Sequence, residues 1–531
     1  MTRTDGLTLD RIWTTARFPA RSQGVSYRGS SWGYPELHAR AESLAARLRR
    51  HGVSRGDVVS VLDFNTPEHF LLHQAVPGIG AVLHSVNLGL PPAQIAATLE
   101  TARPRLVLLG PEVPPPLRGL AQGHETLEMD GAMGFPGLPE APPGPEGTGI
   151  LGREVDEEDD AVLLFTSGTT GTPKGVRYSH RKVLLAIWGI STLLSAHPGP
   201  ASLRSSDTLM GLIPFYHLFG WGLVYIGPFL GAQLVLDGRF EPARTLAVIE
   251  SEHVSWFNAV PTMLHMLLRQ PRREVLRGRK ALVGGMAIPK KLVAECAERG
   301  LEITSIYGFT DGLIAGIGRL SPEETSLELP DQMERLRMAT TLAPLSEVRI
   351  RELPGAGFGE VEFRAPWLPH GYVDDPVRTR EAYPEGWFRT GDLGARDGVG
   401  RLQILDRERD AVKSGGEWIP TSLLENLLSE LPFVEMAAVV GRPDEKWGER
   451  PVAFVQLRDA PPSPVPAMRA HLERHAAEGR IRTWWIPEEF QILPGLPLTS
   501  TGKVDKKSLR ASRTEPTTPP PGTSTGGPPR Q

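Results

Sequence analysis

The sequence predicts an α/β protein with a large N-terminal body of doubly wound sheets, a β subdomain, and a small, mobile α+β domain at the C-terminal end. Three observations predict this fold. The chain has 531 residues, which is too long for one hydrophobic core. Apolar runs of strand length alternate with helical patterns over most of the chain, which indicates parallel sheets covered by helices on both faces. After about residue 350 the pattern changes to β segments punctuated by glycine.

The alternation begins near the N-terminus. Leu37, Ala41, Leu44 and Leu48 fall at spacings of four and three residues, which places them on one face of a helix. The segment DVVSVLDFN then has the composition of a strand, PEHFLLHQAVPGIGA and PPAQIAATLETA have helical patterns, and RLVLLG is a second strand. Gly131 to Gly152 is crowded with proline and glycine, so we expect a surface connection there rather than a core element.

The same alternation resumes after this connection. Strands are predicted in AVLLF, LMGLI, QLVLD, VSWFNAV, KALVGG and LEITSIYG, and helices in PTMLHMLLRQ and IPKKLVAECAERG. GEVEFRAP and GWFRTGDLGARDGVGRLQILDR supply the β subdomain, and the charged stretch DRERD is a candidate hinge. The predicted domains are 1–407 and 408–510, and the polar tail 511–531 is expected to be disordered.

Composition excludes several classes of protein. The formal net charge is −4, so no nucleic-acid partner is predicted. The one cysteine, Cys296, cannot form an intramolecular disulfide or a cysteine metal cluster, and we expect it to be a buried small hydrophobe. The N-terminus lacks an apolar signal region and no apolar run is long enough to span a bilayer. We therefore expect a cytoplasmic protein with peripheral membrane contact at most.

A loop of unusual composition, TSGTTGTPKG, extends from Thr166 to Gly175 directly after an apolar strand pattern. Glycine lets backbone N–H groups approach an anion, and hydroxyls and a lysine add donors, so the loop is a candidate phosphate site. It is neither a Walker A loop, because Gly175 follows Lys174, nor a Rossmann fingerprint. A flexible surface loop is the alternative interpretation.

The segment LLFTSGTTGTPKGV resembles the phosphate loop of the adenylate-forming superfamily, which includes acyl-CoA synthetases, aryl-CoA ligases, luciferases and the adenylation domains of peptide synthetases. Seven further family-like segments follow in the family's order: PFYHLFG, VGGMAIP, IYGFTD, GEVEFRAP, WFRTGDLG, GRLQILDRERDAVKSGGEWI and PLTSTGKVDKK. They span most of the chain from Ala161 to Lys507. One such match is weak evidence, whereas eight in order are strong evidence.

The resemblance implies a two-step reaction that uses ATP, Mg²⁺ and CoA. A carboxylate attacks the α-phosphate of ATP to give an acyl adenylate and pyrophosphate, and a thiol then attacks the mixed anhydride. The residues implied to hold the β- and γ-phosphates are Thr166, Ser167, Gly168, Thr169, Thr170 and Lys174.

Five further residues would serve the nucleotide and the metal by resemblance. Tyr307 would lie against the adenine, Thr310 would donate to the α-phosphate, and Asp311 would bind Mg²⁺. The family usually has Glu at this last position, and Asp is one methylene shorter. Asp392 would accept from both ribose hydroxyls, and Arg407 would add a donor to the same sugar. In isolation, a turn residue or a surface charge is the more usual role of such side chains.

The small domain would supply the catalytic lysine, Lys503, whose ammonium would neutralise charge between the carboxylate and the α-phosphate. A second orientation of this domain would withdraw Lys503 and present the face Lys413 to Ile419, including Gly415 and Gly416, for thioester formation with CoA. Arg409 is the candidate hinge residue, and an ordinary surface arginine is the alternative.

The acid is expected to be a medium- or long-chain fatty acid. PFYHLFG has no acidic residue that could pair with an α-amine, and the stretches that would form the pocket are apolar and aromatic. His217 in this segment would sit beside the carboxylate, although a lone histidine after a strand is often structural. Trp221, four residues later, resembles the aromatic that gates the acyl tunnel in some bacterial fatty acyl-CoA synthetases, and core packing is the alternative.

Three other functions stay open at this point. An aryl-CoA ligase would differ in pocket depth alone. A low-activity binding protein is suggested by Asp311 and by Met286, where the family often has a smaller residue. A luciferase-like oxygenase would share the adenylation step. Some synthetases that this chain resembles are homodimers, so a homodimer is a further expectation.

Overall fold

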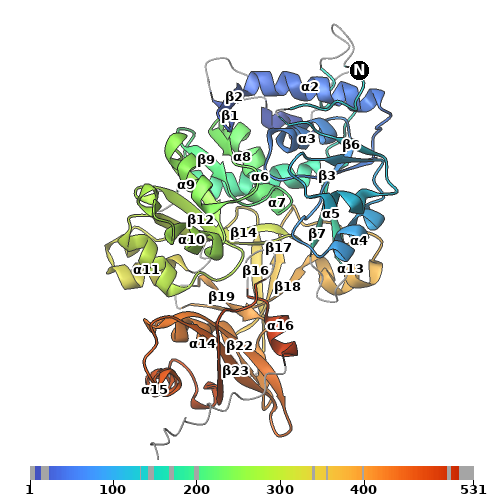
Figure 1. Ribbon diagram of the computed structural model, residues 1–531. Helices are drawn as coiled ribbons and strands as arrows, with labels where there is room; N and C mark the ends of the chain where they lie inside the picture. The colour runs from blue at the N-terminus through green and yellow to red at the C-terminus, as the bar shows by residue number, and fades with distance from the viewer. Residues whose placement is uncertain are drawn as a thin grey trace, which may run out of the picture.

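The computed structural model describes residues 6–13, 23–131, 133–140, 149–166, 173–196, 202–337, 341–353, 357–397, 400–498 and 504–512. Within these residues the strands form four sheets. Three sheets and their helices build the large body, and the small domain is a separate orange and red lobe next to the β subdomain (Figure 1). The predicted α/β class is confirmed.

The six-stranded sheet has the order β6-β5-β3-β4-β7-β8 and is parallel except for its last strand. Its strands are β3 (Val58–Leu62), β4 (Val82–Ser85), β5 (Leu106–Leu109), β6 (Thr126–Glu128), β7 (Asp160–Thr166) and β8 (Lys174–Ser179). The helices of this part of the chain are α2 (Tyr34–Arg50), α3 (Pro67–Gly78), α4 (Pro92–Ala102) and α5 (Pro115–Arg118). The predicted amphipathic face of α2 is buried.

The nine-stranded sheet has the order β15-β14-β13-β12-β11-β9-β10-β1-β2. Its strands are β1 (Gly24–Tyr27), β2 (Ser30–Gly33), β9 (Thr208–Gly211), β10 (Gln233–Leu236), β11 (Trp256–Ala259), β12 (Lys280–Gly284), β13 (Glu302–Phe309), β14 (Leu313–Ile317) and β15 (Thr341–Leu342). The helices are α6 (His180–Ser195), α7 (Leu218–Trp221), α8 (Leu223–Leu230), α9 (Pro242–Ser251), α10 (Pro261–Leu268), α11 (Lys290–Glu298) and α12 (Leu329–Leu336). Cys296 on α11 is buried, as predicted.

The two remaining sheets are smaller. The β subdomain is the antiparallel sheet of β16 (Glu347–Glu352), β17 (Gly359–Arg364), β18 (Phe388–Arg396) and β19 (Leu402–Arg407), with α13 (Pro376–Ala382) beside it. The small domain contains β20 (Val412–Ser414), β21 (Glu417–Ile419), β22 (Val434–Asp444), β23 (Gly448–Leu457) and β24 (Glu489–Leu493), and the helices α14 (Thr421–Ser429), α15 (Pro464–Ala477) and α16 (Lys506–Ala511). It has hydrophobic clusters of its own.

The N-terminal part differs from the sequence prediction in two places. In the predicted surface connection, Gly131–Gly152, the described residues Phe135, Leu138, Ile150 and Leu151 are buried in the core, whereas Pro136, Gly137, Glu140 and Gly149 are exposed. The guanidinium of Arg47 on α2 fixes this connection by donating to the carbonyls of Phe135 and Leu138, at 2.6 and 2.9 Å. The β1–β2 hairpin was not predicted at all, and it joins the second sheet by pairing with β10.

Candidate active site

A buried carboxylate joins three strands at the centre of the candidate site. Asp392 on β18 is 3% exposed. The hydroxyl of Tyr307 on β13 donates to its Oδ2 at 2.6 Å, and Nε of Arg407 on β19 lies 2.6 Å from its Oδ1. The antiparallel register of β18 and β19 places Asp392 opposite Arg407, so the ion pair follows directly from strand pairing.

The Asp392 carboxylate changes the pKa values of both of its partners. The Asp392 carboxylate raises the pKa of the Arg407 guanidinium. Burial, together with Asp392, raises the pKa of the Tyr307 hydroxyl well above its usual range, so Tyr307 stays a donor. Each carboxylate oxygen can accept more than one hydrogen bond, so Asp392 can also accept from a ligand's hydroxyls.

The turn between β13 and β14 carries the next two predicted residues, Thr310 and Asp311. Three aromatic side chains from separate elements fix its backbone. The Tyr178 hydroxyl donates to the carbonyl of Thr310, the Tyr383 hydroxyl donates to that of Asp311 at 3.0 Å, and the indole of Trp367 donates to that of Gly312 at 3.0 Å. Burial of these donors makes the turn rigid.

The side chain of Asp311 fits a metal ligand. Among the described residues its Oδ1 is buried without a hydrogen-bond partner. Burial raises the pKa of this carboxyl, and the Tyr372 hydroxyl, Lys174 and Arg407 lower it in part. A buried carboxylate oxygen without a partner is costly unless a cation binds it, and oxygen ligands suit Mg²⁺. Asp311 is therefore the residue that would hold Mg²⁺.

The candidate phosphate loop connects two antiparallel strands. Thr166 ends β7 and Lys174 begins β8, and these two residues are paired across the strands. The ammonium of Lys174 lies 4.6 Å from the centre of the Tyr372 ring and so faces the Asp311 turn. The predicted residues Ser167, Gly168, Thr169 and Thr170 lie outside the described residues, as does Lys503.

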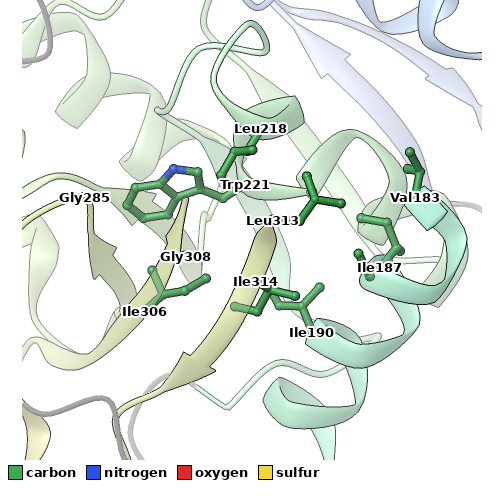
Figure 2. Close-up of a pocket in the computed structure, with 12 residues that line it drawn as sticks. Val183, Ile187, Ile190, Leu218, Trp221, Gly285, Ile306, Gly308, Leu313 and Ile314 are labelled. Carbon is green, nitrogen blue, oxygen red and sulfur yellow. The ribbon is translucent and has the colours of Figure 1, made fainter. Parts of the chain in front are cut away.

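An apolar cavity of about 70 Å³ lies between α6, α7 and the strands β13 and β14 (Figure 2). Trp221 lies across the cavity from α6. The tip of its indole packs against Gly284, because a Cβ atom added to this glycine would lie only 3.2 Å from Cη2 of the indole. The cavity is lined by Val183, Ala186, Ile187, Ile190, Leu218, Trp221, Gly222, Gly285, Ile306, Gly308, Leu313 and Ile314. The predicted pocket residue Trp221 is thus part of the wall.

The cavity and the polar group around Asp392 both use residues near the end of β13. Ile306 and Gly308 line the cavity, and the residue between them, Tyr307, reaches Asp392. Side chains alternate between the faces of a strand, so the two features use opposite faces of β13, next to the Thr310–Asp311 turn in the chain. His217 is half-buried at the start of α7, with its ring 5.0 Å from that of Tyr216.

The backbone around Trp221 is unusual. Leu218 has φ 49°, Gly220 φ 60°, Trp221 φ 55° and Gly222 φ 84°. Left-handed conformations are costly for residues with a side chain and persist only where the surroundings impose them. The orientation of Trp221 is therefore imposed by the α7 segment as a whole.

The small-domain residues lie apart from this site. Gly415 and Gly416 form the exposed β20–β21 turn, where the Gly415 amide donates to the carbonyl of Trp447 at 2.7 Å. Lys413 is exposed with its ammonium 5.4 Å from the Trp418 ring. In this arrangement Lys413, Gly415 and Gly416 of the Gly-rich face are turned to solvent.

Arg409 lies in the connection between β19 and β20, where a hinge was predicted. Its side chain is 53% exposed, and its carbonyl accepts from Arg510 on α16 at 3.0 Å. Nearby, the carboxylate of Asp406 accepts from the amide and hydroxyl of Thr421 at the start of α14. The last strand of the β subdomain is thus tied to the first helix of the small domain, and the connection itself is tied to α16.

Sequence reasoning missed the aromatic residues that support the site. Tyr178, Trp367, Tyr372 and Tyr383 come from four different places in the chain, and their contacts exist only in the folded protein. A sequence signal for them would have been an aromatic near each motif, but aromatic residues are too common in cores to indicate a site.

Comparisons with known proteins identify the family of this chain. The family model of the AMP-binding enzymes matches residues 13–373, and the model of the AMP-binding enzyme C-terminal domain matches 423–503. The chain is 34% identical to a long-chain-fatty-acid–CoA ligase of Thermus thermophilus over 90% of this chain and 89% of that protein. It is 31% identical to a medium-chain-fatty-acid–CoA ligase of Ectopseudomonas oleovorans, over 90% of each.

Relatives with other substrates are also similar. A feruloyl-CoA synthase of Amycolatopsis sp is 28% identical over 93% of this chain and 96% of that protein. The structure of the amide bond synthetase McbA from Marinactinospora thermotolerans superposes with a TM-score of 0.80 and 27% identity, covering 95% of this chain and 98% of that one. In the described part of the chain, no helix is both long and apolar enough to cross a membrane.

Proposed function

Because the chain belongs to the family of AMP-binding enzymes, we propose that it is an ATP-dependent acyl-CoA ligase for medium- or long-chain fatty acids. In the first step a fatty acid carboxylate oxygen attacks the α-phosphorus of ATP, the bond to the β-phosphate oxygen breaks, and pyrophosphate leaves. In the second step the thiol of CoA attacks the acyl carbon and AMP leaves.

The observation that carries this proposal is that neighbouring residues of β13 take part in an apolar cavity and in a group of buried charges. Every residue that lines the cavity is apolar, so it suits an alkyl or aryl tail rather than a charged one. Burial of each methylene of a tail contributes about 0.8 kcal/mol. We expect the carboxylate end of such an acid to meet the nucleotide near the Thr310–Asp311 turn.

The side chains divide the work of the first step. Asp392 and Arg407 would hold the ribose, with Tyr307 beside the adenine. Asp311 would hold Mg²⁺, which neutralises phosphate charge when bound, and Thr310 would donate to the α-phosphate. These groups act by positioning and by charge neutralisation, because phosphoryl transfer needs little else from a protein.

The remaining groups come from segments that close over the nucleotide. The loop from Thr166 to Lys174 would hold the β- and γ-phosphates, and Lys503 would neutralise charge that grows between the two reactants. The turn with Gly415 and Gly416 would reach the site for the CoA step only after the small domain rotates about Arg409, because it is now turned to solvent.

Two relatives, a long-chain fatty acid ligase at 34% identity and a medium-chain one at 31%, favour fatty acids over other acids. An aryl-CoA ligase is the second candidate. It is supported by the similar feruloyl-CoA synthase and by the small cavity, which is closed on one side by the Trp221 indole. A planar aromatic acid is shorter than a long acyl chain, so it would need a smaller enlargement of this space.

The test is AMP release from ATP and Mg²⁺ with dodecanoate, octanoate, palmitate, ferulate or benzoate, with and without CoA. CoA-dependent AMP release with the aliphatic acids supports the proposal, and release with ferulate or benzoate alone supports the aryl-CoA ligase. Silence with all five acids contradicts both and favours the low-activity binding protein.

A pair of lysine variants distinguishes the mechanism from background hydrolysis. Lys503→Ala should lower AMP release by on the order of 100-fold or more, because it removes the ammonium that stabilises the transition state. Lys507→Ala removes an exposed lysine four residues later and should leave the rate unchanged.

A further inference from the structure

Three ligand-type side chains lie together in the small domain, apart from the candidate active site. His471 and His475 on α15 are four residues apart and therefore lie on one face of the helix. Glu430, directly after α14, faces them across the contact between the two helices. Both histidines are more than nine-tenths buried, at 8% and 7% exposed.

The three facing atoms have the spacing of a metal site. Nε2 of His475 lies 3.3 Å from Nε2 of His471 and 3.3 Å from Oε2 of Glu430, and Nε2 of His471 lies 3.6 Å from the same oxygen. Ligand atoms at two corners of a tetrahedral zinc site with bonds of about 2.0–2.1 Å are about 3.3–3.4 Å apart. The observed triangle therefore needs only small adjustments to hold an ion.

We propose that Glu430, His471 and His475 form a site for Zn²⁺, with the fourth position open to water. Two imidazoles and one carboxylate favour Zn²⁺ over Mg²⁺, which prefers oxygen ligands alone. The ion would join α14 to α15.

The surroundings of His475 support this role. Its other ring nitrogen, Nδ1, lies 3.4 Å from Oε2 of Glu478. A carboxylate that accepts the Nδ1 proton directs the Nε2 lone pair at a metal, and this arrangement recurs in zinc sites. The guanidinium of Arg480 is also 3.4 Å from Nδ1, and because it can only donate it must give up this contact when Nδ1 carries the proton, while it can keep its contact with Glu478.

His471 must change partners when the ion binds. Its Nε2 now lies 2.9 Å from the carbonyl of Leu427, and its Nδ1 lies 2.9 Å from Arg474. Metal binding requires Nε2 to give up the carbonyl and Nδ1 to take the proton, so Arg474 must move away. Arg474 is near the surface, and the movement needs no change in the backbone.

Glu430 also connects this site to the large body. Its second oxygen, Oε1, lies 3.3 Å from the ammonium of Lys290 on α11, whereas Oε2 faces the histidines. One carboxylate can therefore bind the ion and Lys290 at once. Lys291 and His265 make the neighbouring contacts, to the carbonyl of Val434 at 2.9 Å and to Glu435 at 3.1 Å.

The experiment measures bound metal in the full-length protein, independently of its activity. The protein is freed of metal with a chelator, incubated with ZnCl₂, passed over a desalting column and analysed for zinc by mass spectrometry. Visible absorption after Co²⁺ addition reports whether the site is four-coordinate. We expect one zinc per chain and a tetrahedral Co²⁺ spectrum in the wild type.

Three variants test the assignment. His475→Gln and Glu430→Gln should each weaken zinc binding at least about tenfold, since even neighbours of metal ligands have effects of that size. His253→Gln removes an exposed histidine in the large body and should bind zinc as the wild type does. Glu430 is 24% exposed, so Glu430→Gln should fold even if a histidine variant does not.

The outcomes are decisive in both directions. Zinc should also raise the melting temperature of the wild type but not of Glu430→Gln, because a ligand that binds only the native state stabilises it. Equal zinc binding by the wild type and both ligand variants would place the ion elsewhere and overturn the proposal. Loss in His475→Gln without loss in Glu430→Gln would overturn the three-ligand site.

Discussion

The polar group around Asp392 and the apolar cavity beside Trp221 both use residues near the end of β13, but different kinds of interaction form them. In the polar group, the Asp392 carboxylate on β18 interacts with the hydroxyl of Tyr307 on β13 and with the guanidinium of Arg407 on β19. The cavity is defined by the shapes of side chains from α6, α7, β13 and β14 and by no directed contact. Removal of one partner from a buried polar pair leaves the other partner unsatisfied, which is costly, whereas a change in an apolar wall alters packing in proportion to the volume changed. Chemistry should therefore be sensitive to single changes in the first region, and substrate choice to changes in the second.

The largest effect should come from Asp392→Asn. This change keeps the shape of the side chain but removes the charge that holds Arg407, and it weakens the acceptor for the ribose hydroxyls. We expect kcat/KM for ATP to fall by on the order of 10²–10³-fold in the exchange of labelled pyrophosphate into ATP. Asp459→Asn makes the same change at an exposed position and should leave the rate unchanged. A loss below threefold would contradict the role of Asp392.

Asp311 should give the next largest effect. Asp311→Asn replaces the unpartnered carboxylate oxygen with a weaker, neutral ligand, so we expect the Mg²⁺ concentration for half-maximal activity to rise about 10-fold or more. Asp311→Glu, which introduces the family's usual residue, should keep the wild-type Mg²⁺ dependence or improve it. Titration of Mg²⁺ at saturating ATP measures both. An unchanged Mg²⁺ dependence in Asp311→Asn would place the metal on other ligands.

Trp221→Ala should change substrate choice and leave nucleotide binding alone. Loss of the indole opens one wall of the cavity, so we expect the ratio of kcat/KM for palmitate to that for octanoate to shift by about tenfold. Trp188→Ala on α6 is the matched control, because this tryptophan is 48% exposed and does not line the cavity. Should the KM for ATP change as much as the chain-length profile, the two regions would not be separable as argued.

The same contrast explains what the sequence could predict. The resemblance based on motifs is confirmed by the family models. Tyr307, Asp311, Asp392 and Arg407 were all predicted. They lie together because Asp392 and Arg407 pair across β18 and β19, and the end of β13 brings Tyr307 and the Asp311 turn to them. Their assigned roles stay predictions.

Features that depend on packing between distant segments could not be predicted from sequence motifs. Trp221 was predicted from its spacing to His217, but the facing wall, with Ile187 and Leu313, comes from segments far apart in the chain. The β1–β2 hairpin was missed for a similar reason, since four-residue strands carry little pattern and the partner strand β10 lies about 200 residues later.

A buried carboxylate outside the site sharpens the comparison and should affect stability rather than activity. Asp63, after β3, is fully buried, but its hydrogen bonds come from the hydroxyl of Thr66 and the amide of Phe64 rather than from a cation. Burial raises its pKa to about 7, and the nearby acids Glu68 and Glu112 add to the shift. Asp392, by contrast, has Arg407 beside it.

The sign of the pH dependence follows from this raised pKa. The folded-state pKa of Asp63 exceeds the unfolded value, so its contribution to stability is full below about pH 4 and is lost as pH rises through about 7. Asp63→Asn cannot titrate, and it should remove part of the fall in melting temperature between pH 5 and pH 8, equivalent to on the order of 1–3 kcal/mol. Asp459→Asn should keep the wild-type slope. If Asp63→Asn also keeps it, Asp63 is charged at neutral pH, and burial without a cation does not distinguish it from Asp392.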